Sequence, residues 1–214
     1  MNKTGSPLSR IFSDEKIISK IKIKLPKMFA IAELESSRAG KIGMEVGSVR
    51  EQILVALLVS AFGENNVETD IPITKYEEDV KVYEKPISIK TITGNSSIKV
   101  VWTVDAKKAK EFFRLYKPSC DILLAIISWD NNPKIKSGLF FIQKNIQEKT
   151  LKKLGKNNYL KLPKEGTNPR GVEISRAAIL EMLNDKNTYQ IKIDWKKDIV
   201  QHKTYKRWLD MWNE

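Results

Sequence analysis

The chain has 214 residues, and its hydrophobic content of 41% is enough to bury a full core in one domain. The net charge of +12, from 38 Lys and Arg residues against 26 Asp and Glu residues, favours nucleic acid as a partner. A membrane is disfavoured, because the basic residues are spread through the chain and no apolar run reaches spanning length. The single cysteine and single histidine exclude an internal disulfide and a Cys/His zinc site, so any hydrolytic metal must bind to carboxylates.

The N-terminal part of the chain is predicted to be helical. We divide the sequence into an N-terminal helical segment, residues 1–40, and a core with a C-terminal extension, residues 41–214, which together form one compact domain. Residues 7–39 have the pattern of two helices split near Pro26, with Ser13 as the expected cap of the first helix. No apolar run follows the basic N-terminal residues, so we expect no secretory signal and a cytoplasmic protein.

The most hydrophobic helix of the sequence is expected at residues 45–62. Glu51 shares one face of this helix with Leu54, Val55 and Leu58, at positions i, i+3, i+4 and i+7. Removing an ionised carboxylate from water costs several kcal/mol unless a cation or hydrogen bonds replace the water. The position of Glu51 therefore predicts a partner elsewhere in the chain.

Strand patterns begin after this helix. Three short runs rich in β-branched residues predict a meander with a break just before Pro86, which is tolerated as the first residue of a strand. These runs are residues 67–76, 78–84 and 86–93. A further helix is expected at residues 104–116.

The second half of the chain contains the most apolar strand pattern. Residues 120–129 form a continuous apolar run, which is typical of a central strand buried on both faces. Residues 137–144 are predicted to pair with it across a turn at residues 131–133, and a strand at residues 171–175 leads into a helix at residues 175–184. The whole pattern predicts an α/β fold with a mixed central β-sheet flanked by helices.

A candidate catalytic set lies on the expected hairpin. Asp79 opens one strand, and Ser88 and Lys90 point to the same side of the next, because strand side chains alternate. In metal-assisted phosphodiester hydrolysis, two carboxylates hold Mg²⁺ against a phosphate oxygen, and a lysine orients the attacking water or favours its deprotonated form. Glu51, Asp79 and Lys90 supply these groups, whereas an ordinary surface ion pair is the alternative for the hairpin residues.

The sequence resembles the PD-(D/E)xK nuclease superfamily and, within it, the ThaI family of type II restriction endonucleases, along the whole chain and most clearly in three stretches. These stretches are GMEVGSVREQILVALL (43–58), TKYEEDVKVYEKPISIKTIT (74–93) and KPSCDILLAIISW (117–129). The resemblance implies a PD-(D/E)xK core in which Glu51, Asp79 and the main-chain carbonyl of Ile89 bind the metal and Lys90 is the catalytic lysine. The chain departs from the superfamily motif, because Ser88 stands where an acid is expected and no Pro-Asp pair precedes the hairpin. We assign the role of the missing acid to Glu51.

Met44 is the first predicted contact with DNA. Gly40, Gly43 and Gly47 surround it and let a backbone approach a ligand closely. We predict that Met44 is an apolar wedge between base steps, with packing against the protein core as the alternative. Lys41, beside it, is a predicted phosphate contact.

Further contacts with DNA are assigned to Ser88, Lys164 and Arg170. Lys164 belongs to a lysine-rich stretch, residues 149–164, which is either a phosphate-facing surface or an ordinary solvated face. Arg170 directly precedes a predicted strand, where it either reads a guanine or pairs with an acid such as Glu173.

These features together predict a Mg²⁺-dependent type II restriction endonuclease that cuts double-stranded DNA. The resemblance implies the palindrome CGCG, which is most simply read by a two-fold homodimer. A cognate DNA methyltransferase is expected in the host, without direct contact with the enzyme. Two alternatives stay open: a structure-specific nuclease such as a Holliday-junction resolvase, and a non-catalytic DNA-binding protein.

Overall fold

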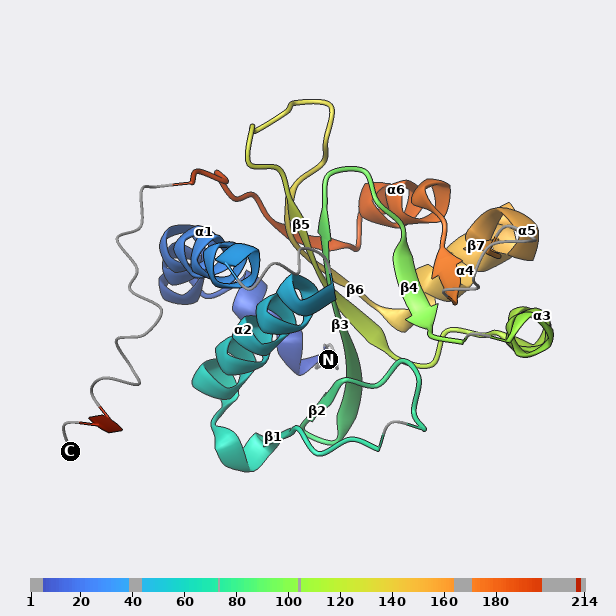
Figure 1. The fold of residues 1–214 in the computed structure, drawn as a ribbon, viewed down its shortest axis with the longest axis horizontal. Coiled ribbons are helices and arrows are strands. Elements are labelled where there is room, and N and C mark those ends of the chain that lie inside the picture. Colours follow the sequence, from blue (N-terminus) through green and yellow to red (C-terminus); the bar gives the residue numbers. More distant parts are fainter. Residues whose placement is uncertain are drawn as a thin grey trace, which may run out of the picture.

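The structure, a computed structural model, describes residues 6–38, 44–72, 74–103, 105–163, 171–197 and 211–212. These residues form the mixed α/β fold that the sequence predicts (Figure 1). The helices are η1 (Pro7–Phe12), α1 (Glu15–Arg38), α2 (Met44–Phe62), η2 (Glu64–Asn66), α3 (Ala106–Leu115), α4 (Lys144–Leu154), α5 (Lys156–Tyr159) and α6 (Arg176–Asn184). The strands are β1 (Val67–Glu68), β2 (Val80–Val82), β3 (Lys85–Thr93), β4 (Ile98–Val101), β5 (Asp121–Ile127), β6 (Gly138–Ile142), β7 (Leu160–Lys161), β8 (Val172–Ile174) and β9 (Tyr189–Ile191). No helix within the described ranges is both long and apolar enough to cross a membrane.

A six-stranded sheet with the order β1-β2-β3-β5-β6-β9 forms the centre of the fold, and β4-β8-β7 form a second, smaller sheet. In the large sheet β3 and β5 are parallel and the other neighbours antiparallel, so the sheet is mixed, as predicted. The turn between β2 and β3 has positive φ at both of its residues, 47° at Tyr83 and 63° at Glu84. This is the geometry of a type I′ turn, and it confirms the predicted hairpin.

Helices cover both faces of the large sheet, and the side chains of the sheet divide into two cores (Figure 1). Alternate residues of β5 show this division. The odd-numbered residues from Leu123 to Ile127 are buried in the core beneath α1 and α2, and the even-numbered residues from Ile122 to Ile126 are buried in the core beneath α4 and α6. The prediction of a central strand buried on both faces is therefore confirmed.

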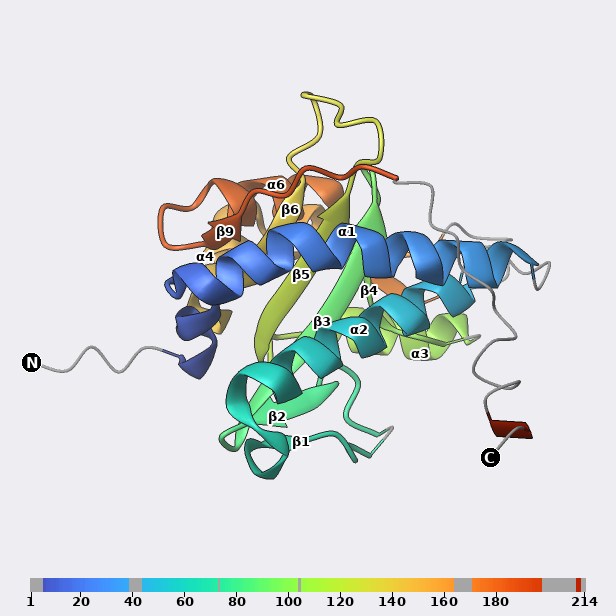
Figure 2. The same ribbon diagram turned by 90° about the vertical axis from the view of Figure 1, so that its left-hand side faces the viewer.

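α1 is a single helix of 24 residues, which corrects the predicted split near Pro26 (Figure 2). Inside a helix, proline lacks the N–H that would bond to the carbonyl four residues earlier, at a cost of about 3 kcal/mol. Leu25 and Phe29 lie beside Pro26 and are 3% and 0% exposed. Burial of each such side chain contributes about 1.5–3 kcal/mol, so packing on the core keeps the helix continuous across the proline.

The cap at the start of α1 is Asp14 rather than the predicted Ser13. The Asp14 carboxylate accepts hydrogen bonds from the main-chain N–H groups of Lys16 and Ile17, at 2.9 and 3.2 Å. The Ser13 hydroxyl instead donates to the carbonyl of Ser9, at 3.2 Å. The short helix η1, which precedes α1, therefore moves the cap by one residue.

The strand predicted at residues 67–76 is wrong beyond its first two residues, which form β1. Further along, main-chain N–H groups bond locally: that of Lys75 donates to the carbonyl of Pro72 at 2.9 Å, and that of Glu78 donates to the carbonyl of Lys75 at 3.3 Å. Pro72 itself has no N–H for a strand partner. The chain therefore reaches the start of β2 through turns.

Candidate active site

Asp79 lies immediately before β2, at the point where the pairing of β2 with β3 begins. Its N–H donates to the carbonyl of Ile87 at 3.0 Å. For the next three residues of β3, the acceptor is the Asp79 carboxylate. Asp79 Oδ2 accepts hydrogen bonds from Ser88 Oγ at 3.1 Å, the Ile89 N–H at 2.6 Å and Lys90 Nζ at 2.8 Å. The carboxylate is thus bound to three consecutive residues of β3.

The same geometry directs the main-chain carbonyl of Ile89 toward the side of β3 on which β2 has ended. The N–H and C=O of one strand residue point to the same side, and the Ile89 N–H points to Asp79. In a continued ladder the N–H of Glu78 would approach the Ile89 carbonyl, but it donates to Lys75 instead. The Ile89 carbonyl therefore faces the side of β3 on which Asp79 lies, past the end of β2.

Ser88 and Lys90 lie on one side of β3, as predicted, since both reach the same oxygen of Asp79. Ser88 is only 3% exposed and donates to Asp79, and its contact with DNA stays a prediction. The side chains of Lys90 and Asp79 are 16% and 35% exposed. Among the described residues, none forms a hydrogen bond with Asp79 Oδ1, so this oxygen is available to a further ligand.

Glu51 approaches this pair from α2. Leu54 and Leu58 of the same face are fully buried, while Glu51 is half-buried. Burial raises the pKa of Glu51 to about 7, the positive charge of Lys90 opposes this change, and the negative charge of Asp79 adds to it. The structure therefore brings Glu51, Asp79 and Lys90 into one electrostatic cluster, and Glu51 is not the isolated carboxylate that its helix alone suggests.

The cluster has the ligands for a hard divalent cation. Its two carboxylates outnumber its one ammonium, so a bound cation would balance the charge and lower the cost of ionising Glu51. Within the described ranges, no group of three or more His, Cys, Asp and Glu side chains is arranged to hold a metal. The protein ligands here would be Glu51, Asp79 and the Ile89 carbonyl, and this oxygen set fits Mg²⁺ completed by water.

Arg50, next to Glu51, is a residue that sequence reasoning missed. It is 6% exposed, and its guanidinium bonds to the carboxylate of Glu33 in α1 and to Thr93 Oγ1 at the end of β3, the latter at 3.1 Å. Burial lowers the pKa of Arg50, and Glu33 opposes this change. These contacts fix α2 against α1 and β3, and thereby fix the position of Glu51. An arginine in so apolar a helix is the signal that could have revealed this role.

Four predicted contacts with DNA fall wholly or partly outside the described residues. Met44 is the first residue of α2, but its side chain lies outside them, and Lys41, Lys164 and Arg170 lie outside them entirely. These four assignments stay predictions. The acid considered as a partner for Arg170, Glu173, accepts a hydrogen bond from the Ser97 hydroxyl.

The lysine-rich stretch is partly neutralised by acidic residues in α6 and directly after it. Lys149 and Lys153 of α4 form ion pairs with Asp185 and Glu181, each at 2.6 Å. Lys152 is exposed, and no described residue forms an ion pair with it. Lys152 is therefore better suited to meet a phosphate than its paired neighbours.

Comparison with known proteins identifies the class of this protein. The family model for restriction endonuclease ThaI matches residues 11–214. A solved structure described as a restriction endonuclease in complex with substrate DNA is 50% identical to the chain, with a TM-score of 0.86, and the match covers 97% of this chain and 99% of the other. A search of curated proteins found no significant match.

The fold is therefore that of a restriction endonuclease, and the protein is a site-specific nuclease. The chain belongs to the ThaI restriction endonuclease family, and the resemblance of the sequence to this family is confirmed. A non-catalytic DNA-binding protein does not fit this assignment.

Proposed function

We propose that this enzyme hydrolyses phosphodiester bonds of double-stranded DNA at the palindrome CGCG, with Mg²⁺ held by Glu51, Asp79 and the main-chain carbonyl of Ile89. One observation carries this proposal: Lys90 binds Asp79 at 2.8 Å where β2 and β3 diverge, and the charges of both residues act on the buried carboxylate of Glu51. The 50% identity to a restriction endonuclease solved with substrate DNA supports DNA as the substrate. We assign the site to the PD-(D/E)xK superfamily, with Glu51 in place of the acid that Ser88 replaces.

The metal ligands would act through the oxygens that the fold leaves available. Asp79 would contribute Oδ1, because Oδ2 is held by donors of β3. Glu51 would contribute a carboxylate whose ionisation near neutral pH a bound cation favours, since its pKa is otherwise about 7. When bound, Mg²⁺ supplies positive charge against a phosphate oxygen and makes hydroxide accessible near neutral pH.

Lys90 would position the attacking water. Its ammonium is held at 2.8 Å from Asp79 and keeps two further donors for water or a phosphate oxygen. Water attacks phosphorus in line, the bond to the 3′ oxygen breaks, and that oxygen takes up a proton from solvent. The products are a 5′-phosphate and a 3′-hydroxyl.

Recognition of DNA would rest mainly on residues outside this cluster. The net charge of +12 favours the duplex electrostatically, with Lys41 and Lys164 as phosphate contacts, Arg170 as a base contact and Met44 as a wedge in the minor groove. A two-fold homodimer would place one active site on each strand of the palindrome. A cognate DNA methyltransferase would protect the host DNA in the same cytoplasm.

A cleavage assay tests this proposal. Supercoiled plasmid carrying CGCG sites and a four-way DNA junction are each incubated with the protein, with Mg²⁺ and then with EDTA. Discrete plasmid fragments that require Mg²⁺ and end within CGCG support the proposal. Cutting of the junction alone would instead support a structure-specific nuclease such as a Holliday-junction resolvase.

A further inference from the structure

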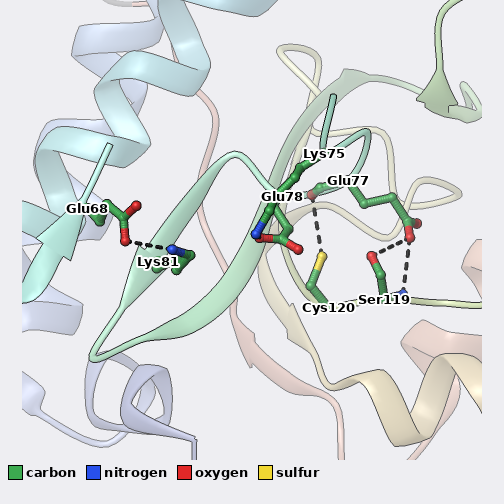
Figure 3. Close-up of polar contacts among 7 residues, drawn as sticks. All are labelled: Glu68, Lys75, Glu77, Glu78, Lys81, Ser119 and Cys120. Atoms are coloured by element: carbon green, nitrogen blue, oxygen red, sulfur yellow. Dashed lines mark hydrogen bonds and ion pairs between the residues drawn. The ribbon is translucent and has the colours of Figure 1, made fainter. Parts of the chain in front are cut away.

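Glu77 is a buried carboxylate two residues before Asp79 that the proposed catalysis does not use. It is 9% exposed. Its carboxylate accepts hydrogen bonds from Tyr116 Oη at 2.8 Å, the Ser119 N–H at 3.1 Å and Ser119 Oγ at 2.6 Å. Its main-chain carbonyl accepts a further hydrogen bond from Cys120 Sγ at 3.4 Å, so Glu77 is held by both side chain and main chain (Figure 3).

The hydrogen-bond donors to Glu77 all belong to the segment between α3 and β5. β5 pairs with β3 in parallel, from Asp121 opposite Ile87 onwards. The segment that donates hydrogen bonds to Glu77 therefore leads directly into β5, which pairs with β3, the strand of Ile89 and Lys90. Through this route the turn segment before Asp79 is fixed relative to the other groups of the site.

The polar character of this contact indicates that the position of the turn segment relative to the start of β5 is fixed. A carboxylate taken out of water needs hydrogen-bond donors to replace the water, and Glu77 has three. An apolar side chain could fill the same place without that desolvation cost. Unlike an apolar contact, hydrogen bonds to one oxygen pair fix both the distance and the direction of the segment.

We propose that Glu77 is a positioning residue, which holds the segment carrying Asp79 against the start of β5. The inference rests on the proposed role of Asp79 as a metal ligand. A cation at Asp79 would weaken the attraction between this carboxylate and the ammonium of Lys90, because like charges repel. The hydrogen bonds of Glu77 do not involve Lys90, so they would hold Asp79 in place when the metal binds.

The test compares the Mg²⁺ dependence of cleavage in the wild type and in Glu77→Gln. Glutamine keeps the shape of the side chain but offers one acceptor oxygen in place of two. We expect the Mg²⁺ midpoint to rise about tenfold or more, as for other residues that orient metal ligands. The rate at saturating Mg²⁺ should largely recover, and the affinity for DNA without metal should not change.

Gln147→Met is the matched control. Gln147 is fully buried and donates through Nε2 to the carbonyl of Cys120 at 2.8 Å, so its loss removes a buried hydrogen bond from the same turn. Within the described part of the chain, it forms no hydrogen bond with the segment that carries Asp79. This variant should lose stability but keep the wild-type Mg²⁺ midpoint, which separates positioning from general damage to the fold.

Three outcomes decide the inference. A wild-type Mg²⁺ midpoint in Glu77→Gln, or an equal shift in Gln147→Met, would overturn it. If Glu77→Gln does not fold, Ser119→Ala removes the 2.6 Å donor alone, and a wild-type midpoint there overturns the inference equally. Asp79→Ala, measured in parallel, separates the two proposals: full cleavage contradicts the proposed function, whereas an inactive Asp79→Ala beside an unshifted Glu77→Gln contradicts only the role of Glu77.

Discussion

Replacing Glu51 by glutamine should stabilise the metal-free enzyme at neutral and alkaline pH. Burial, reinforced by Asp79, raises the pKa of Glu51 from 4.5 to about 7. Between these two values the folded protein binds more protons than the unfolded chain, so the stability falls as the pH rises through this window. Above about pH 7 the whole penalty is present, and Glu51→Gln removes it because the amide carries no charge.

The size of this effect follows from the two pKa values. The difference between 4.5 and about 7, at about 1.4 kcal/mol for each pKa unit, corresponds to about 3 kcal/mol. Solvent reaches a half-buried side chain and screens its charge, which reduces the expected gain to about 2 kcal/mol at pH 8. At pH 4 the wild type and the variant should differ by much less, since Glu51 is then protonated in the folded protein.

Urea unfolding in EDTA at pH 4 and pH 8 measures this difference for the wild type and for Glu51→Gln. Glu148→Gln is the control for the loss of a carboxylate from the surface, because the Glu148 side chain is 54% exposed. Adding Mg²⁺ at pH 8 should then stabilise the wild type more than Glu51→Gln, because metal binding adds to the stability of the folded state. Identical pH dependence in the wild type and Glu51→Gln would refute the desolvation of Glu51, and equal stabilisation by Mg²⁺ would refute its role as a ligand.

Three further predictions concern catalysis and DNA binding. Lys90→Met should slow single-turnover cleavage about a hundredfold while DNA binding in Ca²⁺ persists, and a wild-type rate would exclude its role with water. Lys152→Ala should weaken DNA binding evenly across sequences and lower the slope of log affinity against log salt concentration by about 1. Lys153→Ala should leave this slope unchanged, since Lys153 is paired with Glu181. Equal slopes in the wild type and both variants would contradict the role of Lys152 as a phosphate contact. Met44→Ala should lower the affinity for the cognate site but not for random DNA in a competition assay, and cleavage at the wild-type rate and affinity would exclude the wedge.

Much of the fold could be predicted, because the spacing of apolar residues along the sequence indicates which faces of a helix or strand are buried. The run that forms β5 has apolar residues on both of its faces, and this alone indicates a central strand. The continuity of α1 across Pro26 could not be predicted, because the local penalty of the proline is offset by Leu25 and Phe29 packing on residues far away in the sequence. The strand expected at residues 67–76 failed for a related reason: β-branched residues favour strands, but Pro72 and local turns leave no partner for one.

The proximity of Asp79 and Lys90 could be predicted from the local pattern of the hairpin. Contacts between residues far apart in the sequence could not. Asp79 and Lys90 lie on one hairpin, so the alternation of strand side chains brings them together. The partners of Arg50 and Glu77 could not be predicted, because Glu33 and Ser119 lie 17 and 42 residues away. Only the packing of α1 on α2, and of the turn segment on the start of β5, reveals these contacts.

We propose that Glu51 and Asp79 hold the catalytic metal of this restriction endonuclease. The most direct measurement is single-turnover cleavage, with Mg²⁺, of a DNA duplex that contains one CGCG site, by the wild type and by Glu51→Ala. The loss of a metal ligand removes several kcal/mol of transition-state stabilisation, so we predict a rate about a thousandfold lower in Glu51→Ala, with binding retained in Ca²⁺. Cleavage by Glu51→Ala at the wild-type rate would exclude Glu51 as a ligand of the catalytic metal.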